Sequence, residues 1–275
     1  MSVSPARALT ATVVAVISPA TRAGVLETLT ALAQASGVRP VIVCLGHDAE
    51  APRRHEDGAI VIDGLVPRYL NNAVASLRLS SLPTLAWCRA GDPAALPDLA
   101  RLVDRVVMDR EDPSAGWTLV PEIAPLAGVS DLRWARLTRW RDLIAQFFEM
   151  PEVRTSFTTF DRVEIVGTDS HDARLLAGWL RTRLPGGHLL AVDARSGGSA
   201  QVDTVRLVAA TGSLAVRILP NGSCLETTIS LPAAEPCTRV VPVGSQALAA
   251  LLGEELRVRS RDLAFEDAVR EAEKL

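Results

Sequence analysis

Apolar residues in the first part of the chain come in short runs that alternate with helical patterns. The run at 10–17 is apolar along almost its whole length, as in a strand covered on both faces. Ser18 and Pro19 then suit the N-cap and first position of a helix, which Gly37 ends. Further strands are expected at 38–45, 59–62, 84–88 and 105–109, with helices at 69–80 and 97–103.

This alternation of strands and helices is typical of a parallel sheet with helices packed on its faces. We therefore predict a Rossmann-like, mostly parallel α/β domain over residues 1–115. Residues 113–130 are rich in proline and glycine. Two helices are expected over 131–151, the first capped by Asp131 and the second by Thr138, with Pro151 closing the pair. Residues 116–155 are thus predicted to form a helical connector.

The pattern changes after residue 161, where polar and apolar positions alternate as in half-exposed strands. A helix is expected at 170–184, and Asn221-Gly222 favours a hairpin turn. The chain should end in helices at 245–258 and 261–274. The remaining expected strands lie at 162–168, 188–192, 203–208, 213–219, 224–230 and 239–243. Residues 156–275 are therefore predicted to form an α+β domain with an antiparallel meander.

Composition excludes several classes of partner. The chain has 275 residues, a net charge of -3, one lysine and no basic block, so nucleic acid is not an expected partner. It contains no run of eighteen apolar residues and its first residues lack a signal-peptide layout, so we expect a cytoplasmic protein without a membrane span. Its cysteines have no C-x-x-C spacing and are expected to be reduced; a redox role for Cys224 and Cys237 is the minor alternative.

Motifs for enzyme chemistry are also lacking. The turn at 18–24 contains neither G-x-G-x-x-G nor a phosphate-binding G-x-x-x-x-G-K, and no G-x-S-x-G occurs. The four histidines are not at metal-ligand spacing. We predict no catalytic residue, no cofactor and no metal, although the helix start at Ser18 could still offer backbone N–H groups to an anion.

Residues 131–151 concentrate two of the five tryptophans, two of the five phenylalanines and four arginines. Large aromatics and arginines carry much of the binding energy at protein interfaces. The plainer interpretation is a core helix, because Trp140, Ile144, Phe147 and Phe148 form one apolar stripe at helical spacing. In that interpretation the stripe packs between the two domains and the arginines are solvated.

Three segments together resemble the OpcA family, the glucose-6-phosphate dehydrogenase assembly proteins. They are LPTLAWCRAGDP at 82–93, DLRWARLTRWR at 131–141, and the second domain with LAGWL at 176–180 and LLGEEL at 251–256. The resemblance implies a non-catalytic protein that binds the dehydrogenase, promotes its active oligomer and raises its activity in the oxidative pentose phosphate pathway. The chain departs from the family pattern at Cys88, where members often carry a second tryptophan, and at Arg139, where they often carry proline.

On this basis we expect a partner-binding surface made of eight residues. Guanidinium groups suit carboxylate pairing and aromatic stacking, so the arginines are expected to meet an acidic patch on the dehydrogenase. The residues are Arg133, Arg136, Arg141, Trp134 and Trp140, with Trp87, Arg89 and Asp92 at the end of the 84–88 strand.

Two alternatives stay open. One is a sugar-phosphate- or nucleotide-binding protein, regulatory or enzymatic, that uses the carboxyl ends of the first domain's strands. A weak sugar-phosphate ligand is compatible with either function. The other alternative is a general scaffold with several partners.

Overall fold

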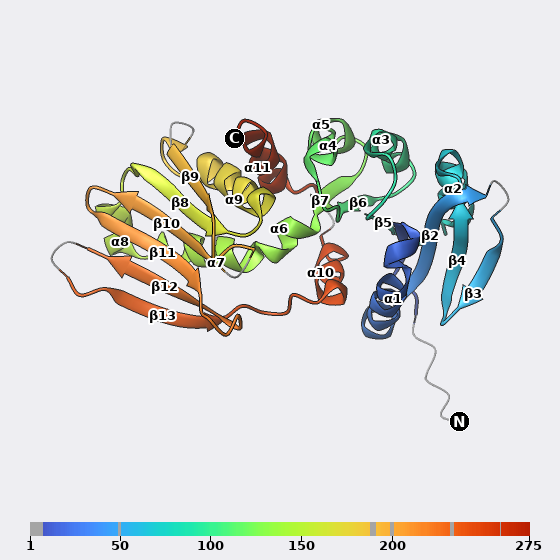
Figure 1. Cartoon of the computed structure of the whole chain (residues 1–275), viewed down its shortest axis with the longest axis horizontal. Coiled ribbons are helices and arrows are strands. Elements are labelled where there is room, and N and C mark those ends of the chain that lie inside the picture. Colours follow the sequence, from blue (N-terminus) through green and yellow to red (C-terminus); the bar gives the residue numbers. More distant parts are fainter. Residues whose placement is uncertain (1–7, 49–50, 188–190, 199–200, 232–233, 259) are drawn as a thin grey trace, which may run out of the picture. The chain divides into compact units, whose positions relative to one another are not determined.

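The computed structural model describes residues 8–48, 51–187, 191–198, 201–231, 234–258 and 260–275. The chain forms two compact units, Met1–Leu132 with Gln246–Asp262 and Arg133–Ser245 with Leu263–Leu275. Each unit is built around one sheet (Figure 1). The expected connector at 116–155 is divided between the units: its part up to Leu132 belongs to the first and the rest to the second.

The first unit holds a seven-stranded sheet in the order β3-β4-β2-β1-β5-β6-β7. Every neighbouring pair is parallel except β3 and β4. All seven residues of the central strand β1 are buried, as its continuous apolar run predicts. The strands are β1 (Ala11–Ile17), β2 (Val38–Asp48), β3 (Arg53–Glu56), β4 (Ala59–Leu65), β5 (Thr84–Cys88), β6 (Arg105–Met108) and β7 (Gly128–Asp131).

Helices follow most of these strands. Gly37 ends α1 with a φ of 68°, a left-handed conformation that suits glycine. The helical elements of this unit are η1 (Pro19–Thr21), α1 (Arg22–Ser36), η2 (Pro67–Tyr69), α2 (Leu70–Leu77), η3 (Pro93–Ala95), α3 (Leu96–Ala100), α4 (Ser114–Trp117), α5 (Val120–Ile123) and α10 (Leu248–Glu255).

Helix α10 comes from far along the sequence yet belongs to the first unit, where it packs against α1. Its last residue, Glu255, is buried, and one carboxylate oxygen accepts from Arg105 Nε at 2.7 Å and from Ser130 Oγ at 2.6 Å. These bonds tie the end of α10 to β6 and β7. Removal of either Arg105 or Glu255 would leave the other charge buried and uncompensated.

The second unit holds a six-stranded sheet in the order β13-β12-β11-β10-β8-β9. Strands β10 to β13 form the predicted antiparallel meander, and β8 pairs with β9 in parallel. Directly opposed residues share a face, and the row Ile165, Val205, Val216 is buried. The strands are β8 (Arg162–Gly167), β9 (Ala191–Ser196), β10 (Thr204–Ala209), β11 (Gly212–Ile218), β12 (Cys224–Ser230) and β13 (Cys237–Pro242).

Helices pack on this sheet, with α7 against β11 and α9 against β8 and β9. Asp169 caps α9 by accepting from the N–H groups of His171 and Asp172. Helix α11 lies close along α9 because Gly178 has no side chain: a methyl group there would overlap the carbonyl oxygen of Ala268. The helices are α6 (Leu132–Arg136), α7 (Thr138–Phe147), α8 (Pro151–Ser156), α9 (Ser170–Arg183) and α11 (Leu263–Ala272).

The predicted fold class is confirmed: a mostly parallel α/β sheet and a second, mixed sheet. Four local details need correction. Pro151, expected to close the pair of helices, is the first residue of α8. β3 and β7 are strands that the sequence patterns did not indicate, and Thr138 is not an N-cap, because α7 starts at Thr138 after Leu137 without a side-chain cap. Most of the strand expected at 188–192 lies outside the described residues, and β9 is described from Ala191.

Candidate functional site

Three side chains meet where β5 and β6 end at the carboxyl edge of the first sheet. Trp87 is buried and its Nε1 donates to Asp109 Oδ2 at 3.2 Å. Arg89 pairs with the same oxygen at 3.0 Å, and its guanidinium lies 5.3 Å from the centre of the Trp87 ring. Because β5 and β6 are parallel neighbours, their ends bring Trp87, Arg89 and Asp109 together. Asp109, which accepts from Trp87, therefore pairs with Arg89 and holds it beside the Trp87 ring at this edge.

The loop after β5 is fixed by backbone hydrogen bonds. The N–H groups of Arg89 and Ala90 both donate to the carbonyl of Val16 on β1, at 2.9 and 3.1 Å. Arg110 Nη1 donates to the Gly91 carbonyl at 2.9 Å, and Asp92 caps η3 by accepting from Ala94 N at 3.0 Å. Asp92 is exposed and Arg89 half-buried, so both can be reached from solvent.

This edge also contains the point between β1 and β5 where the strand order reverses, the usual ligand site of doubly wound sheets. Phosphate sites there depend on unpaired backbone N–H groups. Here Pro19 has no N–H, and those of Thr21 and Arg22 donate to the carbonyls of Ser18 and Pro19. With Arg89 N and Ala90 N bound to Val16, these donors are not available to a nucleotide phosphate.

In the second unit, Trp134 and Arg141 form a stacked pair between α6 and α7. The Arg141 guanidinium carbon lies 3.4 Å from the centre of the Trp134 ring. Its Nη2 donates to the Trp134 carbonyl at 3.2 Å and to Thr138 Oγ1 at 3.0 Å. Trp134 is buried and its other contacts include Phe265 of α11, with ring centres 5.8 Å apart. Arg141 thus uses its stacking and much of its hydrogen bonding within the protein's own fold.

Arg133 is buried in a three-residue charge cluster with α9. Its Nη1 donates to Asp169 and, at 3.0 Å, to Asp172. Burial raises the pKa of Asp172, and the hydrogen bond from Arg133 only partly offsets it. Burial also acts to raise the pKa of Asp169. There, however, the hydrogen bond from Arg133, the positive charge of Arg133 and the hydrogen bonds from two backbone N–H groups together outweigh burial, and the pKa is lowered. Arg133 therefore joins α6 to the start of α9.

The apolar stripe of α7 is part of the second unit's core. Trp140, Ile144 and Phe147 are buried, Phe148 is half-buried, and the helix packs against β11. Arg139 is half-exposed, and its Nε donates to the carbonyl of Pro242 at 3.3 Å.

The structure divides the eight predicted partner-binding residues into two groups. Solvent reaches Arg89, Asp92, Arg136 and Arg141, whereas Trp87, Arg133, Trp134 and Trp140 are buried. A role in partner binding remains a prediction for all eight. The four buried residues can contribute to partner binding only by holding neighbouring residues in place.

A surface that the sequence reasoning missed lies on the second sheet's outer face, opposite the row Ile165, Val205, Val216. Arg162 Nε pairs with Glu164 at 2.8 Å, and Arg217 Nε with Glu226 at 2.8 Å. Val240 on the edge strand is 51% exposed. The polar residues at alternate positions of these strands in the sequence could have predicted this charged face.

The cysteines are too far apart for the suggested redox pair within one chain. Cys224 lies opposite Pro242 and Cys237 opposite Ile229, so an offset of five residues separates them. At strand spacing this is about 17 Å, whereas disulfide Cα atoms lie about 4–7 Å apart. Cys88 is fully buried, which raises the pKa of its thiol to about 12.

Among the described residues, no group of three or more histidine, cysteine or acidic side chains could hold a metal ion. No helix in the described part of the chain is long and apolar enough to cross a membrane.

Residues 127–269, more than half of the chain, match the family described as the C-terminal domain of the glucose-6-phosphate dehydrogenase subunit. Two curated relatives are named putative OxPP cycle protein OpcA. The one from Nostoc punctiforme is 30% identical over 125 residues, which cover 42% of this chain and 27% of the relative. The one from Synechocystis sp. is 27% identical over 124 residues, which cover 42% of this chain and 26% of that relative. The match thus spans about a quarter of each relative's length.

Two solved structures share the fold. The super-repressor mutant of Gal80p from Saccharomyces cerevisiae has a TM-score of 0.53 at 8% identity, covering 89% of this chain and 82% of that one. Aldose-aldose oxidoreductase from Caulobacter crescentus has a TM-score of 0.50 at 10% identity, and the match covers 96% of this chain and 98% of that one. At such identities the likeness concerns the fold alone.

Proposed function

The chain belongs to the OpcA family, and from this premise we propose that it is a non-catalytic partner of glucose-6-phosphate dehydrogenase. It binds the dehydrogenase in the cytoplasm and promotes its active oligomer in the oxidative pentose phosphate pathway. One observation carries the proposal: residues 127–269 match a domain described as part of a glucose-6-phosphate dehydrogenase subunit.

Two features support a role without catalysis. The sequence lacks the nucleophile, phosphate-loop and metal-ligand motifs that reactive sites use. At the carboxyl edge of the first sheet, the backbone donors of Arg89, Ala90, Thr21 and Arg22 are bonded to the protein's own carbonyls. This arrangement favours a protein partner over a nucleotide-binding enzyme.

Three accessible members of the predicted surface, Arg136, Arg89 and Asp92, are the contacts we propose. Arg136 is half-exposed at the end of α6, the helix that also carries the buried Arg133. Arg89 and Asp92 are reachable at the edge of the first unit. The guanidinium of Arg89 is already positioned by Asp109 and Trp87, so it loses little freedom on pairing with a partner's carboxylate, as suits a binding hot spot.

Charge reversal at Arg136 tests this surface. We expect Arg136→Glu to weaken binding of purified dehydrogenase by at least about tenfold, since like charges then meet across the interface. Biolayer interferometry with immobilised dehydrogenase measures the affinity. Arg154→Glu is the matched control, because Arg154 is an exposed arginine on α8 outside the predicted surface; it should bind like the unmodified chain.

Two results would contradict the proposed surface or the proposed function. Normal affinity of Arg136→Glu, with loss of binding in an outer-face variant such as Arg217→Glu, would place the interface on the second sheet. Absence of binding by the unmodified chain at micromolar concentrations would overturn the proposed function itself.

A further inference from the structure

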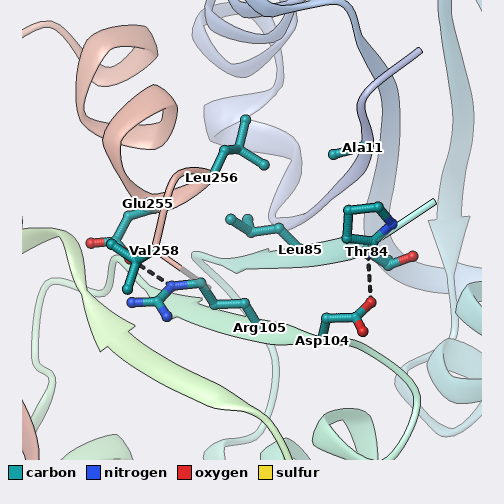
Figure 2. A pocket seen from close by; sticks show the side chains of 9 residues that line it. Ala11, Thr84, Leu85, Asp104, Arg105, Glu255, Leu256 and Val258 are labelled. Atoms are coloured by element: carbon teal, nitrogen blue, oxygen red, sulfur yellow. Dashed lines mark hydrogen bonds and ion pairs between the residues drawn. The ribbon is translucent and has the colours of Figure 1, made fainter. Parts of the chain in front are cut away.

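A cavity of about 230 Å³ lies at the amino edge of the first sheet, the edge opposite Trp87 and Arg89. Its lining comes from the starts of β5 and β6 and from the end of α10, all within the first unit. Figure 2 shows Asp104, Arg105 and Glu255 around it together with the apolar Leu85, Leu256 and Val258. The cavity is separate from every residue of the proposed dehydrogenase surface.

Arg105 has more donors at this cavity than it uses. The residue is only 5% exposed, and its Nε donates to Glu255 at 2.7 Å. Within the described part of the chain, its two Nη groups make no hydrogen bond, although the side chain lines the cavity. Figure 2 shows the guanidinium beside Glu255 and Val258. These Nη groups face the cavity, where the hydroxyl oxygens of a bound molecule could accept from them.

Two carboxylates at the cavity also keep free acceptor positions. Glu255 takes both its hydrogen bonds, from Arg105 and Ser130, on the single oxygen Oε2. Asp104 accepts from the Thr84 backbone N–H at 2.7 Å through Oδ2. Among the described residues, Glu255 Oε1 and Asp104 Oδ1 have no hydrogen-bond partner. The cavity therefore offers donors on one side chain and acceptors on two others.

The local charge decides which kind of molecule suits these groups. Glu255 neutralises Arg105, and Asp104 adds one negative charge. The carbonyl end of α10, which terminates at Glu255, adds a partial negative charge of the helix dipole. An anion such as a phosphate ester is disfavoured here. Hydroxyl groups suit the site, because each can accept from Arg105 and donate to a carboxylate.

We propose that this cavity binds a small, neutral polyol such as a free monosaccharide. Arg105 donates to its hydroxyl oxygens, Asp104 and Glu255 accept from its hydroxyl groups, and Leu85, Leu256 and Val258 cover its carbon face. The volume of about 230 Å³ lies below the roughly 300–1,000 Å³ of pockets for drug-sized ligands, which limits the ligand to about one sugar ring.

Calorimetric titration and thermal unfolding of the whole chain test the site, with glucose as the neutral probe and glucose 6-phosphate as the charged one. We expect glucose to bind and to raise the melting temperature, and the phosphate ester to bind at least about tenfold more weakly. Asp104→Asn keeps an acceptor for the Thr84 N–H but loses the charged acceptor, and should weaken glucose binding about tenfold.

A blocking variant keeps the test independent of folding. Val258 lies exposed at the cavity, so Val258→Trp should fill the entrance, leave the unfolding transition in place and abolish glucose binding. Val240→Trp is the matched control, since it changes an exposed valine of the second unit and should bind glucose normally. No glucose binding at millimolar concentration, binding that survives Val258→Trp, or tighter binding of the phosphate ester would each overturn the proposal. The dehydrogenase is absent from these measurements, so their failure leaves the proposed function untouched.

Discussion

At the residue scale, burial separates arginines that look alike in the sequence. Arg133 and Arg136 occupy the same short helix, yet Arg133 is buried against Asp169 and Asp172 whereas solvent reaches Arg136. The expected carboxylate pairing with a partner stays a prediction, and the carboxylates that Arg133 pairs with in the structure belong to this chain itself. The partners lie 36 and 39 positions along the chain, which no local pattern reveals. A guanidinium that suits an interface equally suits an internal ion pair.

Loss of the buried arginine should be costly. Arg133→Met leaves the buried Asp172 and the half-buried Asp169 without their shared cation, so we expect the free energy of unfolding to fall by about 3–5 kcal/mol. Urea denaturation followed by tryptophan fluorescence measures it. The exposed Arg154→Met is the control and should change stability by no more than about 0.5 kcal/mol. A loss below about 1 kcal/mol for Arg133→Met would mean that the cluster contributes little to the fold.

At the element scale, the sequence pattern predicts the long apolar elements well but misses short strands that contain polar residues. The central strand β1 and helix α1 follow the pattern closely. Strand β3 reads Arg-Arg-His-Glu and was missed because it has no apolar residue; it is held by a hairpin turn at Asp57-Gly58, where both φ values are positive. Strand β7 was missed because two of its four residues, Ser130 and Asp131, are buried polar residues.

The close contact of α9 with α11 gives a prediction at this scale. Gly178→Ala should push the helices apart and lower the free energy of unfolding by about 1–3 kcal/mol, because its methyl group would overlap Ala268 and lie 2.8 Å from Ala272 N. In contrast, Gly24→Ala on α1 meets nothing within 4 Å and should stabilise the chain by about 0.5–1 kcal/mol. Equal effects of the two variants in denaturant unfolding would contradict the assigned packing.

At the scale of the whole molecule, the chain pairs a mostly parallel α/β unit with an α+β unit, and segments of both units are interleaved in the sequence. Periodicity was enough to predict these two architectures. It could not show that α10 belongs to the first unit, because that placement depends on the contacts of Glu255 with Arg105 and Ser130. It also could not show the cavity at the amino edge, which exists only once α10 is in place.

The proposed function requires that the chain act on glucose-6-phosphate dehydrogenase without catalysing a reaction itself. Steady-state kinetics of the purified dehydrogenase, combined with light scattering on the same samples, measures both parts of this requirement. We predict that adding the chain raises the rate at subsaturating substrate and increases the mean mass of the dehydrogenase particles, whereas the chain alone shows no turnover. An unchanged rate, substrate affinity and particle mass at saturating amounts of the chain would contradict the proposed function.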